Sequence, residues 1–245
     1  MGRPGAEVRF SIARILCDES LLNFGIQAER IMTENAKNET QSSLGFSLLQ
    51  AAHARMVFGR RVRVLAEILS ARIPPRSAVL DIGCGDGTLG NLLAERGSEI
   101  SIEGVEFAER PQCGIRCRAF DGAKLPFPDR TFDVCLFVDV LHHTDDPTIL
   151  LREARRVTRR FVLIKDHLSE NGFDFKTLQF MDWVGNRPHG VRLPYNYQSR
   201  KEWEASFAKC GLSIAQWTTK VPLYPFPFSL LVGRGLHFVA LLEKV

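Results

Sequence analysis

Glycine residues gather in the stretch "VLDIGCGDGT" at residues 79–88, and a further glycine stands at position 90. They form two overlapping patterns, Gly83-x-Gly85-x-Gly87 and Gly85-x-Gly87-x-x-Gly90, and the second has the spacing of a dinucleotide-binding turn. A strand-like apolar run precedes the turn and a helix-like run follows it. Backbone N–H groups and a helix N-terminus would therefore face a bound ligand. The glycines alone leave open which adenosine-bearing ligand that is, and a plain tight turn also fits them.

Two acidic residues distinguish between the possible ligands. Asp81 stands two residues before Gly83, and Asp86 lies inside the turn. Carboxylates at these positions would repel a doubly charged pyrophosphate, whereas they would attract a ligand that carries an ammonium group and a sulfonium centre. S-adenosylmethionine is such a ligand, so the turn predicts S-adenosylmethionine rather than a dinucleotide.

Two further acids follow at spacings that suit an adenosine group. Glu106 closes the next strand-like run, where a carboxylate can accept hydrogen bonds from both ribose hydroxyls. Asp121, in "FDGAKLPFPD", is placed to accept from an adenine amino group while the Gly122 N–H donates to the ring. An ordinary Asp-Gly surface turn is the alternative at residues 121–122.

Histidines follow two later strand-like runs and are the candidates for proton transfer. His142 and His143 come directly after the run at 132–140, and Asp166 and His167 end the run at 160–167. Methyl transfer to a protonated acceptor needs a base, and imidazole is suited to that role near neutral pH. We expect His143 and His167 to be catalytic and His142 to contact the acceptor; simple packing or helix capping by His142 and His143 remains open.

An aromatic, turn-rich segment at residues 168–198 follows the second of these runs. Insertions after a strand at the carboxyl edge of such a sheet cover the active site. We therefore expect a cap that contacts the acceptor, although a loop packed only on itself is the alternative. The expected contacts are Trp183, His189, Tyr195, Asn196 and Tyr197.

The elements that position these residues alternate along the chain between short apolar strands and helix-compatible segments. Strands are predicted at 78–82, 100–106, 115–120, 132–140, 160–167, 212–219 and 236–244. The first five favour a parallel sheet with helices on both faces, and the last two could form an antiparallel pair at one edge. We expect a weakly ordered arm at 1–45 and one domain at 46–245. That domain divides into N-terminal helices (46–75), a cofactor-binding core (76–167), the cap (168–198), and a last helix with the edge strands (199–245).

Composition bounds the class of protein. The 245 residues carry 45% apolar and 24% charged residues with a net charge of +4, which is typical of a globular protein with one core. Basic residues concentrate at 55–63 and 152–160, most simply as solvated helix faces, with a nucleic-acid surface as the alternative. The six cysteines show no C-x-x-C pair, which indicates reduced thiols in the cytoplasm and neither a zinc site nor a disulfide framework. No apolar run has the length of a membrane span, and the N-terminus lacks the core of a signal peptide.

The ordered series "VLDIGCGDG", "GVEF" and "FDGAKLPFPDRTFDVCLFVDVLHHTDDP" resembles the motifs of class I S-adenosylmethionine-dependent methyltransferases. The resemblance covers about residues 76–167 and is closest to the small-molecule group that includes the ubiquinone and menaquinone C-methyltransferases. It implies an α/β fold of Rossmann-like, doubly wound type, with seven strands and an antiparallel last strand. The short segment "FAERPQCG" at 107–114 departs from the family, which usually has a crossover helix there.

The resemblance also assigns roles to individual positions. It places the methionine moiety against the turn, the ribose against Glu106, the adenine against Asp121 and Gly122, and the route to the sulfonium against Val138 and Asp139. The turn residues concerned are Asp81, Gly83, Cys84, Gly85 and Gly87.

These observations together predict an enzyme that transfers a methyl group from S-adenosylmethionine to an O, C or N atom of a small, apolar or aromatic metabolite, leaving S-adenosylhomocysteine. The Asn/Asp-Pro-Pro-Tyr/Phe tetrad of amino-group methyltransferases is missing after the fourth strand, where the sequence reads "VDVLHH". A Pro-Cys motif for cytosine C5 methylation is also missing. The alternatives are a macromolecular or RNA methyltransferase that uses the arginine-rich helices, and a regulatory module that binds the cofactor without turnover.

Overall fold

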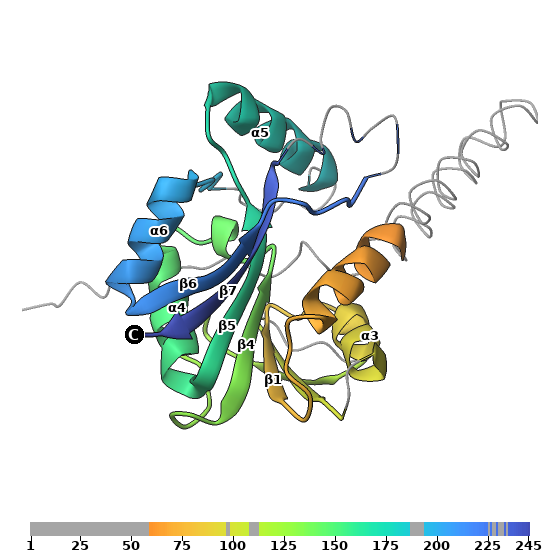
Figure 1. The fold of residues 1–245 in the computed structure, drawn as a ribbon, viewed down its shortest axis with the longest axis vertical. Coiled ribbons are helices and arrows are strands. Elements are labelled where there is room, and N and C mark those ends of the chain that lie inside the picture. The colour runs from red at the N-terminus through yellow and green to blue at the C-terminus, as the bar shows by residue number, and fades with distance from the viewer. Residues whose placement is uncertain are drawn as a thin grey trace, which may run out of the picture.

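A seven-stranded sheet forms the centre of the molecule (Figure 1). The computed structural model describes residues 59–96, 99–107, 113–186, 194–224, 226, 229, 233 and 235–245. The strand order is β3-β2-β1-β4-β5-β7-β6. The strands are β1 (Ala78–Ile82), β2 (Ser101–Glu106), β3 (Arg116–Ala119), β4 (Phe132–Val138), β5 (Thr158–His167), β6 (Leu212–Thr218) and β7 (His237–Lys244).

The directions of the strands confirm the predicted doubly wound sheet. The pairs among β1 to β5 are parallel, whereas β7 runs antiparallel to both β5 and β6. Each strand lies within two residues of its predicted bounds. The central strands were readable from sequence because both faces of β4 and β5 are covered, which requires nearly continuous apolar runs.

Helices cover both faces of the sheet (Figure 1). On one face, α4 (Pro147–Val157) and α6 (Arg200–Lys209) pack on a core that includes Phe137 and Phe238. On the other face, α3 (Thr88–Arg96) and the helical residues 59–70 bury Leu93 and Leu69. The result is a three-layer α/β arrangement around one sheet.

The positions at which these helices begin are set by side chains that accept from free backbone N–H groups. Asp146 accepts from the Thr148 N–H at the start of α4, where a proline also occupies the first turn. Ser199 and Glu202 form a reciprocal capping box at the start of α6. These caps fix where the chain turns from loop to helix beside β4 and β5.

The crevice between β1 and β4 is the place where this sheet can hold a ligand. The chain continues from β1 to β2 on one side and from β4 to β5 on the other, so the loops after β1 and β4 diverge. The carboxyl ends of these strands lie level, since Ile82 pairs with Val105 and with Phe137. One edge of the sheet therefore holds the predicted site residues, namely those of the glycine turn together with Glu106, Asp139 and His167.

The segment after β5 contains a helix, α5 (Gly172–Asn186), which lies beyond the carboxyl end of β5 (Figure 1). Leu178 on α5 is fully buried and packs in a small cluster with Tyr197 and Leu236. The aromatic side chains of Phe173, Phe180 and Trp183 are exposed on the same helix. The predicted arm at 1–45 lies outside the described residues, so the predicted domain boundaries stay predictions. In the part of the chain that the structure describes, no helix is both long and apolar enough to cross a membrane.

Candidate functional site

The glycine turn after β1 adopts a backbone that favours glycine. Gly83, Gly85 and Gly87 have φ values of 77°, 61° and 77°, in the left-handed region. A Cβ at Gly83 would lie 2.6 Å from a methyl carbon of Val140, in the loop after β4. A side chain at this position would push the two loops of the crevice apart, so Gly83 permits their close contact.

Asp86 occupies the end of the turn where a dinucleotide would place its pyrophosphate. Its Oδ1 accepts from the Thr88 N–H at 2.9 Å, at the start of α3. A carboxylate at the N-terminus of this helix already interacts with the positive end of the helix dipole. This geometry supports the prediction that the turn does not bind a pyrophosphate.

Two buried carboxyl groups lie beside the turn. Asp81 and Glu106 are each 2% exposed, and Glu106 accepts from the Gly85 N–H at 3.0 Å and from the Phe107 N–H at 2.9 Å. Burial and the nearby Glu106 raise the pKa of Asp81 to about 7. Burial also raises the pKa of Glu106, against the effect of its two hydrogen bonds. Neither group forms an ion pair with any residue that the structure describes, so a cationic ligand would relieve their repulsion.

Asp121 and Gly122 form a turn after β3. The exposed Asp121 accepts from the N–H groups of Ala123 and Lys124 through Oδ1, and these hydrogen bonds lower its pKa. Gly122 is buried with a φ of 78°. The turn itself is therefore formed as expected, and the contact of these two residues with adenine stays a prediction.

Asp139 lies at the centre of a buried ion-pair cluster in the loop after β4. It accepts from Lys165 Nζ of β5 and, at 2.5 Å, from Arg61 Nη2 of the helix at 59–70. Burial disfavours the charged carboxylate, but Lys165 and Arg61 outweigh it and hold the pKa of Asp139 well below its usual range. Asp139 has a φ of 56°, a strained backbone for a residue other than glycine. The neighbouring Val138, also predicted to line the sulfonium route, is 5% exposed.

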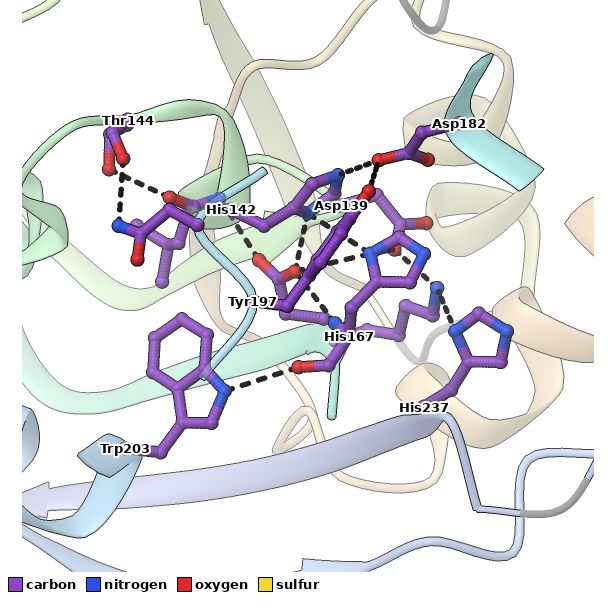
Figure 2. Close-up of polar contacts among 12 residues, drawn as sticks. Asp139, His142, Thr144, His167, Asp182, Tyr197, Trp203 and His237 are labelled. Carbon is purple, nitrogen blue, oxygen red and sulfur yellow. Dashed lines mark hydrogen bonds and ion pairs between the residues drawn. The ribbon is translucent and has the colours of Figure 1, made fainter. Parts of the chain in front are cut away.

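A second buried carboxylate, Asp166, contacts two histidines (Figure 2). His142 Nδ1 lies 2.5 Å from Asp166 Oδ1, and His167 Nδ1 lies 3.1 Å from His142 Nδ1. Burial disfavours a charged His142, yet the attraction of Asp166 and the hydrogen bond between them raise its pKa. Burial and the nearby His142 lower the pKa of His167. The two imidazoles therefore differ: the charged form of His142 is favoured, and so is the neutral form of His167, which can accept a proton.

His143 and His237 lie in the same region but are less accessible. Both ring nitrogens of His143 and the Nε2 atom of His237 are buried, and none of them has a hydrogen-bond partner among the described residues. Burial holds the pKa of each well below the usual histidine value. His143 could thus accept a proton only after a neighbouring side chain moved, so the geometry supports His167 more strongly than His143 as a base.

The predicted cap contacts reach this cluster in part. The Tyr197 hydroxyl donates to Asp182 of α5, and Asp182 Oδ2 lies 3.9 Å from His142 Nε2 (Figure 2). Asn196 Nδ2 instead donates to the Thr144 carbonyl at 2.9 Å and so ties the cap to the loop after β4. Tyr195 packs near the Tyr197 ring, with 6.2 Å between centroids. Trp183 is 46% exposed, and His189 lies outside the described residues.

Three charged residues of the cluster were not predicted: Arg61, Lys165 and Asp182. Arg61 and Asp182 come from helices far in sequence from β4, and no local spacing connects them with Asp139 or His142. The sequence did contain a signal for Lys165, because this lysine interrupts the apolar run that begins with "FVLI". In the structure its side chain is fully buried. A lysine in such a strand needs a buried partner.

Comparison with known proteins agrees with this geometry. A family model described as "Methyltransferase domain" matches residues 52–216. The chain is 30% identical over 110 residues to 27-O-demethylrifamycin SV methyltransferase of Amycolatopsis mediterranei. The aligned region covers 39% of this chain and 40% of that protein. The chain is also 30% identical over 93 residues to ubiquinone biosynthesis O-methyltransferase of Pseudomonas aeruginosa, which covers 33% of this chain and 39% of that protein. The chain thus spans about two fifths of the length of these relatives.

Solved structures share the fold at low sequence identity. A SAM dependent methyltransferase from Aquifex aeolicus has a TM-score of 0.52 at 17% identity, with 74% of this chain and 89% of that chain covered. The geranyl diphosphate C-methyltransferase from Streptomyces coelicolor, solved with S-adenosyl-L-homocysteine, has a TM-score of 0.55 at 15% identity, with 74% and 78% covered.

The residues around the glycine turn fit S-adenosylmethionine. The left-handed glycines present a backbone without side chains, and the carboxyl groups of Asp81 and Glu106, which form no ion pair with a described residue, suit a cationic ligand with ribose hydroxyls. The family model covers more than half of the chain, and its motifs coincide with this turn. The chain therefore belongs to the methyltransferase-domain family.

Proposed function

We propose that this protein methylates an O, C or N atom of a small metabolite and that His167 takes the proton of an acceptor that carries one. The observation that supports this most directly is the buried group formed by Asp139, His142, Asp166 and His167. Their ligand-capable atoms all lie within 4.8 Å of one another at the carboxyl ends of β4 and β5. This is the edge of the sheet where the cofactor turn also ends.

Residues of the turn would hold and orient the cofactor. S-adenosylmethionine supplies a methyl group on a positively charged sulfur, which a nucleophile can displace in line. Asp81 and Glu106 would attract its ammonium group and accept from its ribose hydroxyls, while Asp121 and Gly122 would contact the adenine. In support of this, Glu106 ends β2 and Asp121 follows β3, on the side of β1 away from β4.

His142 and His167 would have different roles in proton transfer. Asp166 favours the charged form of His142, and burial together with His142 favours the neutral form of His167. Within the described residues, His167 Nε2 has no hydrogen-bond partner, so this atom is available to an acceptor proton. His143 remains the second candidate base, and it would require a rearrangement of its packing.

The charge of the cluster supports an uncharged acceptor. Three carboxylates, those of Asp139, Asp166 and Asp182, face the cations Arg61 and Lys165 and a protonated His142. Because these charges balance, the cluster offers no excess positive charge for a phosphate. The two relatives named above carry the names of small molecules, rifamycin SV and ubiquinone, which supports the same class of acceptor.

The arginines that suggested a nucleic-acid partner are partly committed to contacts within the protein. Arg61 binds Asp139, Arg155 donates to the Gly211 carbonyl, and Arg156 pairs with Glu153. These contacts favour a small acceptor over RNA, although Arg60 and Arg63 are exposed.

The test is a screen of uncharged hydroxylated aromatics and quinone-like compounds with methyl-labelled S-adenosylmethionine, followed by mass spectrometry of the product. We expect cofactor binding by calorimetry and a product that gains one methyl group. Cofactor binding without turnover of any small molecule in the screen or in cell extract would favour the regulatory module. Labelled RNA, together with salt-sensitive RNA binding, would instead establish the macromolecular alternative.

A further inference from the structure

Three cysteine side chains converge behind the glycine turn, on the side away from the histidine cluster. Cys84 belongs to the turn, Cys113 precedes β3, and Cys117 lies within β3. The Sγ atoms of Cys84 and Cys117 are 3.4 Å apart, and the three Sγ atoms all lie within 4.8 Å of one another. Cys84 is buried and the other two are half-buried.

Glycines make room for these sulfurs. A Cβ at Gly104 of β2 would lie 2.4 Å from Cys84 Sγ, and a Cβ at Gly87 would lie 3.0 Å from Cys113 Sγ. The thiols also share one acceptor, since Cys84 and Cys113 each lie 3.8 Å from the Gly85 carbonyl oxygen. The convergence thus depends on three separate segments that meet where side chains are absent.

We propose that Cys84, Cys113 and Cys117 form a binding site for a soft, thiophilic metal ion, with Zn²⁺ as the representative probe. Zinc binds cysteine sulfur at about 2.3 Å in tetrahedral geometry, which places two ligand sulfurs about 3.8 Å apart. The Cys84–Cys117 separation of 3.4 Å is close to this value and the other two are at most 4.8 Å, so small side-chain movements would bring all three sulfurs to one ion. Each thiol would release one proton to solvent on binding, and a water molecule or an added thiol would take the fourth position.

The three-fold convergence favours a metal over a disulfide. A disulfide would use two of the sulfurs and leave the third without a role, whereas thiolate ligands in this number are typical of sites for zinc or cuprous ions. The cysteine spacing in sequence could not reveal the group, because Cys84 and Cys117 are separated by 33 positions. The group forms only when the turn after β1 packs against β3.

A bound ion would also restrain the cofactor turn. The Gly85 carbonyl faces two of the thiols while the Gly85 N–H donates to Glu106, so the backbone of one residue contacts both the proposed metal ligands and the acid assigned to the ribose. We expect zinc to change the affinity for S-adenosylmethionine. This second expectation rests on the proposed function of Glu106, whereas metal binding itself does not.

The experiment uses the full chain with Cys17→Ser, because Cys17 lies outside the described residues, under a phosphine reductant. Competition between the protein and a zinc-sensitive dye measures affinity and stoichiometry. We expect one Zn²⁺ per chain, at least about tenfold weaker binding in Cys113→Ser and in Cys117→Ser, and unchanged binding in Cys210→Ser. Cys210 is the matched control, since it is a free, buried thiol elsewhere in the fold. Circular dichroism checks that each variant is folded.

Absence of stoichiometric zinc binding, or equal binding by all the variants, would overturn the proposal. So would a disulfide between Cys84 and Cys117 that forms with peroxide in a protein that takes up no zinc. Calorimetry with S-adenosylmethionine, with and without zinc, then measures the coupling. Loss of cofactor binding in both conditions would contradict the proposed function and leave the metal result standing.

Discussion

Two imidazoles share the surroundings of Asp166, yet their pKa values shift in opposite directions. His142 contacts the carboxylate directly, and this contact raises the pKa of His142 against the effect of burial. The pKa of His167 is lowered by burial and by the adjacent His142. One carboxylate thus sets the protonation states of two histidines, by direct attraction and by the charge that it induces next door.

Substitution of His167 tests its role as the base. In His167→Gln we expect turnover of an identified acceptor to fall by about 100-fold or more, with the affinity for S-adenosylmethionine unchanged. In the unaltered protein the neutral imidazole is active, so the rate should rise with pH, and the midpoint of the rise should lie below about pH 6.5, the ordinary histidine pKa, because burial and His142 lower the pKa of His167. Stopped assays across pH 5–8 measure both effects. An acidic limb that persists in His167→Gln would assign the proton to another group, with His143→Gln as the next variant.

Substitution of Glu106 tests the cofactor half of the site. Glu106→Gln removes a charge that accepts from Gly85 and is assigned to the ribose, so we expect S-adenosylmethionine to bind about 1.5–3 kcal/mol more weakly in calorimetry. Glu99→Gln is the matched control, because Glu99 is exposed and its one ion pair among the described residues is with Arg76. Unchanged affinity in Glu106→Gln would remove the ribose assignment.

The residues that sequence could predict are those whose roles follow from nearby positions. Asp81, Glu106 and the glycines lie at strand ends, so an apolar run and its terminus were enough to find them. Arg61 and Asp182 reach the cluster through tertiary packing of distant helices, and nothing in their local sequence encodes it.

At the scale of elements, one ion-pair cluster joins the helix at 59–70 to β4 and β5. Arg61 and Lys165 both donate to Asp139, so a helix that appeared from sequence to be a lead-in contributes a side chain to the site. The same contacts hold Asp139 in its strained backbone conformation.

Removal of the buried lysine should be costly. Lys165→Met leaves the buried Asp139 carboxylate with Arg61 and with His167 Nδ1 3.7 Å away, and we expect the free energy of unfolding to fall by about 3–5 kcal/mol in urea titrations. The double variant Asp139→Asn, Lys165→Met should recover part of this loss, because the buried carboxylate is gone and the Arg61 that loses its partner is partly exposed. Equal stabilities for Lys165→Met and the unaltered protein would show that Arg61 alone satisfies the carboxylate.

The pH dependence of this contribution follows from the lowered pKa of Asp139. A carboxylate with a depressed folded pKa stabilises the protein fully above its unfolded pKa of about 3.9, and the stability is lost as pH falls toward the folded value. We therefore expect the stability gap between the unaltered protein and the double variant to narrow below about pH 4.

The cap helix depends on a different polar contact. Tyr197→Phe removes the hydroxyl that donates to Asp182, so we expect faster amide hydrogen exchange in α5 and a higher KM for the acceptor, with cofactor affinity unchanged. Glu204→Gln on the exposed surface of α6 should change neither quantity. If exchange in α5 is the same in both variants, the cap is held by the packing of Leu178 rather than by this hydrogen bond.

The strands were easier to predict than α5 for a physical reason. Strands buried on both faces require continuous apolar runs, and such runs can be recognised in the sequence. In α5 the aromatic residues Phe173, Phe180 and Trp183 are exposed, so apolar residues do not mark its buried face.

At the scale of the whole molecule, the residues proposed to bind the cofactor and those proposed to act on the acceptor lie at one edge of a single sheet. A ligand that binds only the folded chain stabilises it by mass action. At a concentration 100 times its Kd, S-adenosylmethionine should add about 2.7 kcal/mol to the free energy of unfolding. Thermal melts with and without the cofactor measure this, with Glu106→Gln at the same concentration as the control, where the shift should be smaller. A melting temperature that does not change when S-adenosylmethionine is added would mean that the turn does not bind this cofactor.

The contact between Gly83 and Val140 has a consequence for attempts to engineer this enzyme. A library that diversifies the loop after β4 to accept new substrates would include Val140, and a larger side chain there would press on the backbone at Gly83. Variants selected for a new acceptor through a larger residue at position 140 would then bind the cofactor more weakly. Improved variants would come mainly from changes at other positions. A library that keeps Val140 constant and varies α5 instead would separate the two traits.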